Sequence, residues 1–335
     1  MGAIKGVGKG AVATIIENRR KEKYQNIFDL VKKVDLRAAN KKTLENLALA
    51  GGFDSFDKTH RAQYFNPDGD GIIFLEKVIR FGARYQESLN SAQTTLFGEQ
   101  SEEVYQELII PNAPEWQNLE QLKREKEVVG IYLSGHPLDD FKKEMHWFTN
   151  GVLSNLKDLK PLVNKNINVA GIINDVEFLE SKNGKQWCKF TLEDFSEQYE
   201  FRIFGEEFLK FKHFINVNQF VRLKLNIKEG WRNQDTGRIG DPRIQFLSFE
   251  MLHEAINNNS KKLTLKFDIR NLQAERILRL KNELNRFKGD KPVCFDIIDS
   301  EKPLKLTLNS RKQKVSISPE LLDHLENNDW VYKLN

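Results

Sequence analysis

The chain has 335 residues, of which 39% are hydrophobic and 30% charged, and its formal net charge is +4. A chain of this length suits two to four domains. It has no apolar run near the roughly 18 residues of a membrane span, and no charged-then-apolar leader opens it. Its two cysteines, Cys188 and Cys294, are far apart in sequence and indicate neither a disulfide framework nor a zinc site. The sequence therefore predicts a cytoplasmic protein with no membrane contact.

Charge is unevenly spread along the chain. Residues 1–65 hold 13 Lys/Arg against 7 Asp/Glu, whereas residues 66–145 hold 8 against 15. The remaining residues hold 31 against 26. An excess of positive charge at both ends predicts contact with a polyanion there, and a different task for the acidic middle.

Residues 1–65 have the pattern of a helix-hairpin-helix region that binds DNA. A tight turn at Gly6-Val7-Gly8 leads into an amphipathic helix, and two more helices are expected over residues 24–34 and 40–56, the second with Asn40 as its N-cap. Glycines let the backbone approach a phosphate, and N–H groups at a helix start bind its oxygens without reading bases. The competing interpretation is a plain turn with solvated basic residues. The expected duplex contacts are Lys5, Gly6, Gly8, Lys9, Gly10, Arg19 and Arg20, and the four cations among them are expected to flank the turn.

Residues 66–150 are predicted to be largely helical, with an exposed loop that carries QTTLF (93–97). Leu96 and Phe97 can fill an apolar pocket on a partner, worth roughly 1.5–3 kcal/mol each, while the Gln93 amide fixes the register. Ordering the loop offsets part of this gain, so we expect weak docking. The alternative is that both apolar side chains fold back onto the chain's own helices.

Two further stretches contain residues typical of metal or catalytic sites. NPDGDGIIFLEK (66–77) begins like a calcium loop, with Asn66, Asp68 and Asp70 at the first ligand positions, but Lys77 stands where a bidentate glutamate is needed. In SGHPLDDF, His136 lies near Asp139 and Asp140 without a nucleophile. We therefore expect a solvated acidic turn and a structural helix stop, with no metal site, cofactor or catalytic residue.

Residues 165–254 change to a period of two, which predicts β-strands. Five strands are expected, the first two joined at Asn183-Gly184, with one short helix over residues 206–215 after the third strand. This order matches a five-stranded oligonucleotide/oligosaccharide-binding (OB-fold) barrel.

The outward face of this predicted barrel combines aromatic and cationic side chains, as stacking on bases and tracking of phosphates require. The expected single-strand contacts are Lys182, Lys185, Trp187, Lys189, Arg202, Phe204, Trp231, Arg232 and Arg238. The competing interpretation is that Trp187 packs under a neighbouring domain and that the cations are ordinary surface.

Residues 260–335 follow a polar linker and alternate strands with two helices, expected over residues 274–287 and 319–326. They predict a small α+β domain. The predicted fold class is therefore multidomain α+β, with a helical N-terminal half, an OB-fold barrel and this last domain.

The order of these stretches closely resembles the C-terminal part of the alpha subunit of bacterial DNA polymerase III, the replicative polymerase of the C family. The stretches are IKGVGKGAVATIIENR, VDLRAANKKTLENLALAGGFDSF, QTTLF and EKEVVGIYLSGHPLDDF, followed by the predicted barrel. They cover roughly residues 2–255, and GAIKGVG and YLSGHPLD are the most specific.

The resemblance implies that Gln93, Leu96 and Phe97 bind the beta sliding clamp, which makes residues 66–150 the clamp-binding region. It also implies that the hairpin holds duplex product DNA and that the barrel meets single-stranded template. In some members the last domain docks the clamp-loader tau subunit, although residues 260–335 match that domain only loosely. The family's catalytic aspartates and their magnesium lie upstream, so the resemblance implies a DNA-directed DNA polymerase of which this stretch is an inactive C-terminal fragment.

Two other classes of protein share some of these features. An NAD-dependent DNA ligase combines the same modules, but with the barrel before the hairpins and a cysteine zinc site between them. A non-catalytic adaptor could use the DNA-binding domains as a scaffold. Two isolated cysteines argue against the ligase, and a start within the hairpin motif argues against the adaptor.

Overall fold

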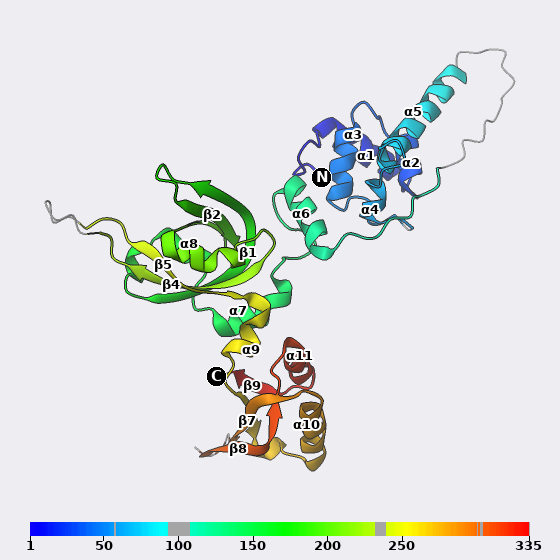
Figure 1. Ribbon diagram of the computed structural model, residues 1–335. Helices are drawn as coiled ribbons and strands as arrows, with labels where there is room; N and C mark the ends of the chain where they lie inside the picture. The colour runs from blue at the N-terminus through cyan, green and yellow to red at the C-terminus, as the bar shows by residue number, and fades with distance from the viewer. Residues whose placement is uncertain (57, 93–107, 232–238, 300, 302–303, 335) are drawn as a thin grey trace. The chain divides into compact units, whose positions relative to one another are not determined.

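The computed structural model describes residues 1–56, 58–92, 108–231, 239–299, 301 and 304–334 (Figure 1). The chain divides into two compact units, Met1–Pro137 and Leu138–Asn335, which we describe separately. The first unit is helical, and the second contains two β-sheets. No helix in these described ranges is long and apolar enough to cross a membrane.

The described residues of the first unit form six helices. They are α1 (Lys9–Lys21), α2 (Ile27–Lys33), α3 (Lys41–Leu49), α4 (Arg61–Tyr64), α5 (Phe74–Ala92) and α6 (Asn118–Val129). Helices α1 to α5 contribute to one hydrophobic core, and α6 packs against α3. Asn40 caps α3 as predicted, because its side chain accepts a hydrogen bond from the Thr43 N–H at 3.0 Å. Phe28 of α2 contacts Phe74 and Phe81 of α5 edge-to-face, with ring centroids 6.1 and 5.6 Å apart. The core is therefore continuous across residue 65, where the sequence suggested a boundary.

A buried ion pair joins α4 to α6. The guanidinium of Arg61 binds the fully buried carboxylate of Glu125 and also Asp54. Glu125 accepts further hydrogen bonds from the N–H groups of Leu133 and Ser134, each at 3.0 Å, and from the Ser134 hydroxyl. This one carboxylate thus fixes both the C-terminal half of α6 and the start of the SGHP stretch.

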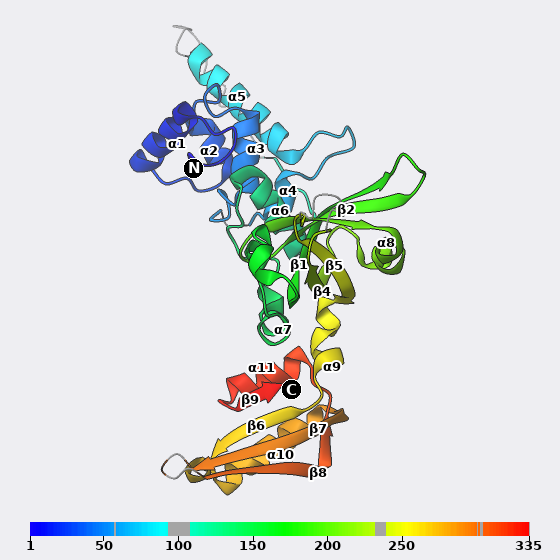
Figure 2. The same cartoon turned by 90° about the vertical axis from the view of Figure 1, so that its left-hand side faces the viewer.

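The first sheet of the second unit has five antiparallel strands in the order β3-β2-β1-β4-β5. The elements are β1 (Asn166–Glu180), β2 (Gln186–Glu193), β3 (Gln198–Phe204), α8 (Gly205–Phe211), β4 (Phe220–Lys228) and β5 (Arg243–Met251). The five strands and the helix after the third are confirmed, and α8 lies against β2 and β3 (Figure 2). Strands β3 and β5 form the two edges, and no pairing between them is found among the described residues.

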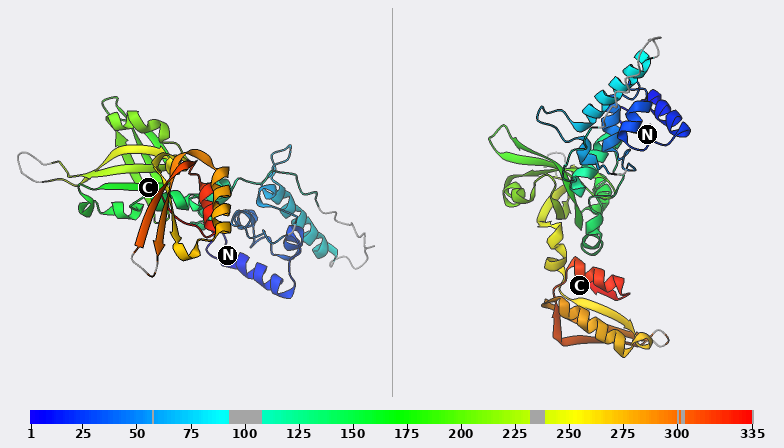
Figure 3. Two further views of the ribbon diagram at one scale, coloured as in Figure 1. Left: turned by 90° about the horizontal axis from the view of Figure 1, so that it is seen from below. Right: turned by 90° about the vertical axis from the view of Figure 1, so that its right-hand side faces the viewer.

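The second sheet has four strands in the order β8-β7-β6-β9. Its elements are β6 (Leu263–Asp268), α10 (Ala274–Arg286), β7 (Lys288–Asp299), β8 (Leu304–Val315), α11 (Pro319–Asn327) and β9 (Val331–Leu334). Strands β6 and β7 are parallel, with α10 as the crossover, and the other pairs are antiparallel. Both helices cover the same face of the sheet (Figure 3). The small α+β arrangement predicted for these residues is confirmed.

Short helices connect these elements. They are α7 (Lys142–Phe148), α9 (Ala255–Asn259) and the 3-10 helices Asp139–Phe141, Leu153–Lys157, Lys160–Leu162, Lys212–Phe214, Leu252–Glu254 and Ile269–Asn271.

Replacing Glu125 by Gln should destabilise the first unit by roughly 3 kcal/mol, because it leaves Arg61 without its buried counter-charge. Hydrogen exchange of the α4 and α6 amides measures this local free energy of opening. The matched control is Glu120→Gln on the same helix, which breaks only the exposed pair with Arg124 and should cost less than about 0.5 kcal/mol. Equal losses of protection in the two variants would contradict the assignment.

The stability contributed by Glu125 should depend on pH. Burial alone would raise the pKa of Glu125, but hydrogen bonds from Ser134, Arg61 and the Leu133 N–H outweigh burial and lower the pKa. A carboxyl whose pKa is lowered by folding stabilises the folded state above its unfolded pKa, and this stabilisation is lost as the pH falls through the folded pKa. The stability difference between the wild type and Glu125→Gln should therefore shrink from neutral to acidic pH. A constant difference would show that the charge of Glu125 is not what matters.

Candidate nucleic-acid interface

The hairpin before α1 is held by hydrogen bonds from its own protein. The carbonyl of Lys5 accepts from the Asn46 amide at 2.6 Å, and the carbonyl of Gly6 accepts from the Thr43 hydroxyl at 3.0 Å. The N–H of Lys5 donates to the Val128 carbonyl at 2.8 Å. Helices α3 and α6 therefore fix the position of the turn.

The N-terminus of α1 is open to solvent. Gly8 is its N-cap in an extended conformation, no described side chain caps it, and the first turn holds no acidic residue. A Cβ added at Gly8 would meet nothing within 4 Å. The exposed cations Lys5 and Lys9 lie on either side of the turn in sequence. Unsatisfied N–H groups and the positive end of the helix dipole make this position suitable for a phosphate.

Gly6 is required by the geometry of the turn. Its φ of +70° lies in the left-handed region, and a Cβ there would come within 3.1 Å of the Asn46 amide nitrogen and 3.6 Å of Cγ of Lys42. Lys42, in the first turn of α3, thus adds an exposed cation beside the hairpin. Lys42 is not among the contacts predicted from the sequence, because it reaches the turn only when α3 folds against the hairpin.

Arg19 and Arg20 do not lie beside the turn. Both are in the last turn of α1, about 15 Å along the helix from its N-terminus. The expectation that they flank the hairpin is wrong, because the helix carries them to its far end. That Arg19 and Arg20 contact DNA stays a prediction, and such a contact would lie at the C-terminal end of α1, away from the hairpin.

The outward face of β2 and β3 carries a stacked aromatic pair. Trp187 and Phe204 are paired across the strands, with ring centroids 4.9 Å apart and planes 22° from parallel. Phe204 is 55% exposed. A flat aromatic surface of this kind can stack on a base, at about 1–3 kcal/mol per base.

The neighbouring cations on this face are already paired with carboxylates. Lys189 binds Glu177 at 2.9 Å and Glu200 at 3.8 Å, and Arg202 binds Glu200 at 2.9 Å. The hydrogen bond to Glu177 raises the pKa of Lys189. Positive charge at Lys189 and Arg202 is therefore less available to phosphates than the sequence suggested.

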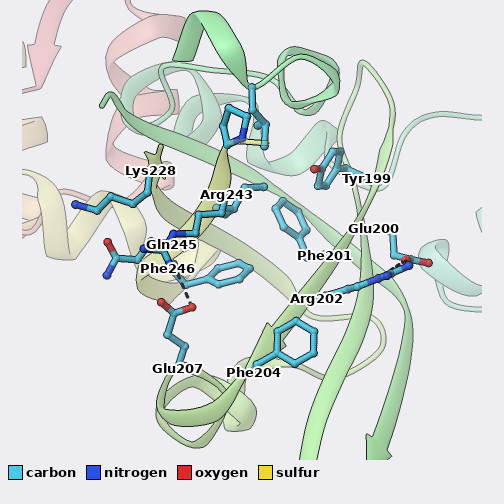
Figure 4. A pocket seen from close by; sticks show the side chains of 13 residues that line it. Tyr199, Glu200, Phe201, Arg202, Phe204, Glu207, Lys228, Arg243, Gln245 and Phe246 are labelled. Atoms are coloured by element: carbon cyan, nitrogen blue, oxygen red, sulfur yellow. Dashed lines mark hydrogen bonds and ion pairs between the residues drawn. The ribbon is translucent and has the colours of Figure 1, made fainter. Parts of the chain in front are cut away.

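A groove of about 680 Å³ lies between the edge strands β3 and β5 (Figure 4). The aromatic side chains of Tyr199, Phe204 and Phe246 line it together with the cations Lys228 and Arg243. Its acidic lining residues are Glu200 and Glu207, and burial raises the pKa of Glu207. Tyr199, Lys228 and Arg243 are not among the contacts predicted from the sequence. The positions of two of them could have indicated a site. Lys228 is the last residue of β4 and Arg243 is the first residue of β5, so both lie at the base of the same loop.

The loop between β4 and β5 brings an exposed tryptophan to this groove. Trp231 is 75% exposed, and the Arg243 guanidinium lies 4.1 Å from the centroid of its ring. Lys228 and Arg243 face each other across the two strands. Like charges in that position repel, and an anion between them would relieve the repulsion. At the base of the loop, a Cβ on Gly230 would come within 2.0 Å of the Gly240 carbonyl oxygen.

Several predicted contacts lie elsewhere or outside the described residues. Lys182 and Lys185 are exposed at the β1–β2 turn. Helix α5 ends at Ala92, and the residues Gln93, Leu96, Phe97, Arg232 and Arg238 lie outside the described part of the chain.

The stretches with metal-like or catalytic residues have structural partners. Asp68 accepts hydrogen bonds from the N–H groups of Asp70 and Ile72, each at 2.9 Å, and pairs with Lys77. His136 packs edge-to-face on Tyr132. No group of three or more His, Cys, Asp or Glu side chains forms a candidate metal site within the described ranges.

Comparison with known proteins gives two family matches. The helix-hairpin-helix motif family matches residues 1–64, and the family of the C-terminal domain of the DNA polymerase III alpha subunit matches residues 263–335. The second match extends the resemblance past residue 255, where the sequence motifs end.

Curated relatives match most of the chain. The DNA polymerase III subunit alpha of Pseudomonas fluorescens is 29% identical over 307 residues, which are 88% of this chain and 25% of that protein. The subunit of Escherichia coli O157:H7 is 32% identical over 224 residues, or 66% of this chain and 18% of that protein. A solved structure of RecG bound to a three-way DNA junction is 17% identical, covers 72% of this chain and 31% of that chain, and has a TM-score of 0.20, too low to show a shared fold.

Replacing both Lys228 and Arg243 by Gln should weaken binding of oligothymidine. It should also reduce the slope of log affinity against log salt by about 1.4, because each of the two lost phosphate contacts removes about 0.7. Fluorescence anisotropy across a salt series measures both quantities. The control is Lys210→Gln with Lys212→Gln, which removes the same charge from exposed positions at α8 away from the groove. A slope that falls equally in both double variants would mean that the groove has no special role.

Proposed function

We propose that this chain, which belongs to the family of bacterial DNA polymerase III alpha subunits and corresponds to the C-terminal region of its members, holds the polymerase on DNA and on its sliding clamp. The chain spans between 18% and 26% of the length of the curated relatives. For the whole protein we propose DNA-directed DNA polymerase activity with magnesium. That chemistry is expected from stretches of the relatives that this chain does not match, so the chain alone should hold DNA without extending it.

The observation that carries the DNA-binding part is the open N-terminus of α1. Its hairpin carbonyls at Lys5 and Gly6 are bonded inward to α3, which leaves the N–H groups of the helix start for a ligand. Lys5, Lys9 and Lys42 add positive charge around the turn. Contacts of this kind go to phosphates and are independent of base sequence, as a replicative enzyme requires.

We propose an OB fold for the five-stranded sheet, with single-stranded template as its ligand. The strand order β3-β2-β1-β4-β5 with a helix between β3 and β4 supports this assignment. The stacked pair Trp187 and Phe204 offers a platform for bases, and Lys228 and Arg243 offer charge to the backbone. The template would thus run over the exposed ring of Phe204 towards the loop that carries Trp231.

We propose that Gln93, Leu96 and Phe97 bind the sliding clamp. A clamp that encircles DNA dissociates slowly, so a weak tether is enough to keep the polymerase at a high effective concentration near the primer end. Burial of two large apolar side chains supplies the affinity, offset by ordering of the loop. Processive synthesis would then result from adding weak contacts to DNA and to the clamp.

For residues 260–335 we propose attachment of a partner protein, with the clamp-loader tau subunit as the candidate. The match of residues 263–335 to the C-terminal domain of the DNA polymerase III alpha subunit supports this proposal.

Replacing Leu96 and Phe97 by Ala should lower the affinity for a purified bacterial sliding clamp by at least about tenfold, because two side chains lose their apolar pocket. Affinity of the chain for primed DNA should stay nearly unchanged. Calorimetry with clamp and anisotropy with DNA measure the two effects. Leu89→Ala is the matched control, since Leu89 is an exposed leucine of α5 outside the motif. Comparable clamp affinity in the double variant would refute the tether.

A further inference from the structure

The helix layer of the small C-terminal domain leaves one strand of its sheet uncovered. Helices α10 and α11 pack in a single core over the buried side chains of β6 and β7, such as Leu265 and Val293. On the same face, β8 presents Leu304, Leu306 and Leu308, which are 60%, 49% and 45% exposed. Their register opposite Asp299, Ile297 and Phe295 places all three on the helix-covered side of the sheet.

An apolar slot of about 380 Å³ lies between α10 and this strand. Helix α10 contributes Ile277, Leu280 and Leu284, and the strands contribute Phe295, Ile297 and Leu308. Ile277 is 48% exposed even though it points towards other apolar groups. Leucine and isoleucine side chains at about half exposure on both a helix and the strand beside it are unusual for the surface of a single domain.

The opposite face of the same sheet is polar and internally bonded. Asp296 accepts a hydrogen bond from the Thr307 hydroxyl at 2.6 Å and pairs with Lys305 at 3.0 Å. The Cys294 thiol donates to the Asn309 side chain at 2.9 Å. The exposed leucines are therefore confined to the side where a further helix would lie.

The rim of the slot is positively charged. Lys281 of α10 and Lys312 of β8 line it directly, and Arg311 and Lys314 are neighbours on β8. Strand β8 carries four Lys/Arg residues and no Asp or Glu. A second copy of the same strand would repeat these charges and be repelled, whereas an acidic segment would be attracted.

The outer edge of β8 is less suitable for docking than its face. The register with β7 shifts between Pro292 and Cys294, and the N–H of Gln313 turns back to the Ser310 hydroxyl. Such an irregularity interrupts the row of free N–H and C=O groups that an added strand would need. A helix needs only the side-chain face.

We propose that this slot binds an acidic amphipathic α-helix of a partner protein, which completes the helix layer beside α10. The inference deepens the proposal that residues 260–335 attach a partner, and it rests on that proposal. The apolar side of the partner helix covers Leu306, Leu308 and Ile277, and its acidic flanks meet Lys281 and Lys312.

The test uses the full chain and a synthetic amphipathic helix of about 14 residues, with leucines on one face and glutamates on the other. Fluorescence anisotropy should detect binding that weakens with salt, and a version with lysines in place of glutamates should bind at least about tenfold less tightly. Leu306→Asp should abolish binding. The control Val331→Asp replaces a 60% exposed residue of β9 on the polar face and should leave binding unchanged.

Reversing the charge of the two lysines that line the slot gives a second, independent test. Lys281→Glu with Lys312→Glu should reject the acidic peptide and accept the lysine version. Circular dichroism of each variant checks that the domain stays folded. The proposal is overturned if the acidic peptide binds no better than a scrambled peptide, if Leu306→Asp leaves binding intact, or if sedimentation shows that the slot pairs two copies of the chain.

Purified tau distinguishes the two proposals. If tau binds the wild type and Leu306→Asp equally, attachment by residues 260–335 stands and the slot is not the site. If tau fails to bind while the acidic peptide binds and responds to both sets of variants, the slot stands and the choice of tau fails.

Discussion

The buried carboxylate of Glu125 is the constraint on which the N-terminal unit depends. It binds Arg61 of α4, and it accepts hydrogen bonds from residues 133 and 134 beyond the end of α6. Three residues further along α6, the Val128 carbonyl accepts the N–H of Lys5. The position of the hairpin before α1 is thus tied to an ion pair in the interior, and displacing a buried pair of this kind is costly because the carboxylate of Glu125 would lose its counter-charge.

The two candidate DNA surfaces use charge in different ways. Around the hairpin, Lys5, Lys9 and the helix dipole act together, and no acidic residue lies in the first turn of α1. On the five-stranded sheet, carboxylates bind Lys189 and Arg202, whereas Lys228 and Arg243 sit opposite each other at the loop. The first surface therefore has the character of a phosphate clamp, and the second that of an aromatic track with charge at one end.

Much of the fold could be predicted from local patterns, because caps, turns and periodicity act over a few residues. Asn40 as a cap, the turn at Asn183-Gly184 and the helix after β3 are examples. The site was harder to predict because it depends on long-range packing. Lys42 reaches the hairpin only through α3, Glu177 and Glu200 bind Lys189 only through the strand register, and α1 carries Arg19 away from the turn. The leucines of β8 illustrate the same limit, since their alternation is typical of a covered face and they are exposed in the described part of this domain.

The close approach of Gly230 to Gly240 has a consequence for how such a protein can diverge. The backbone segments at Gly230 and Gly240 are in contact where the loop leaves β4 and β5. At the same place the N–H of Gly240 donates a hydrogen bond to the Trp231 carbonyl. Residues inserted between these two contacting segments would lengthen the loop without shifting β4 against β5. Evolution could therefore lengthen or shorten the arm that carries Trp231 while the sheet beneath it keeps its register.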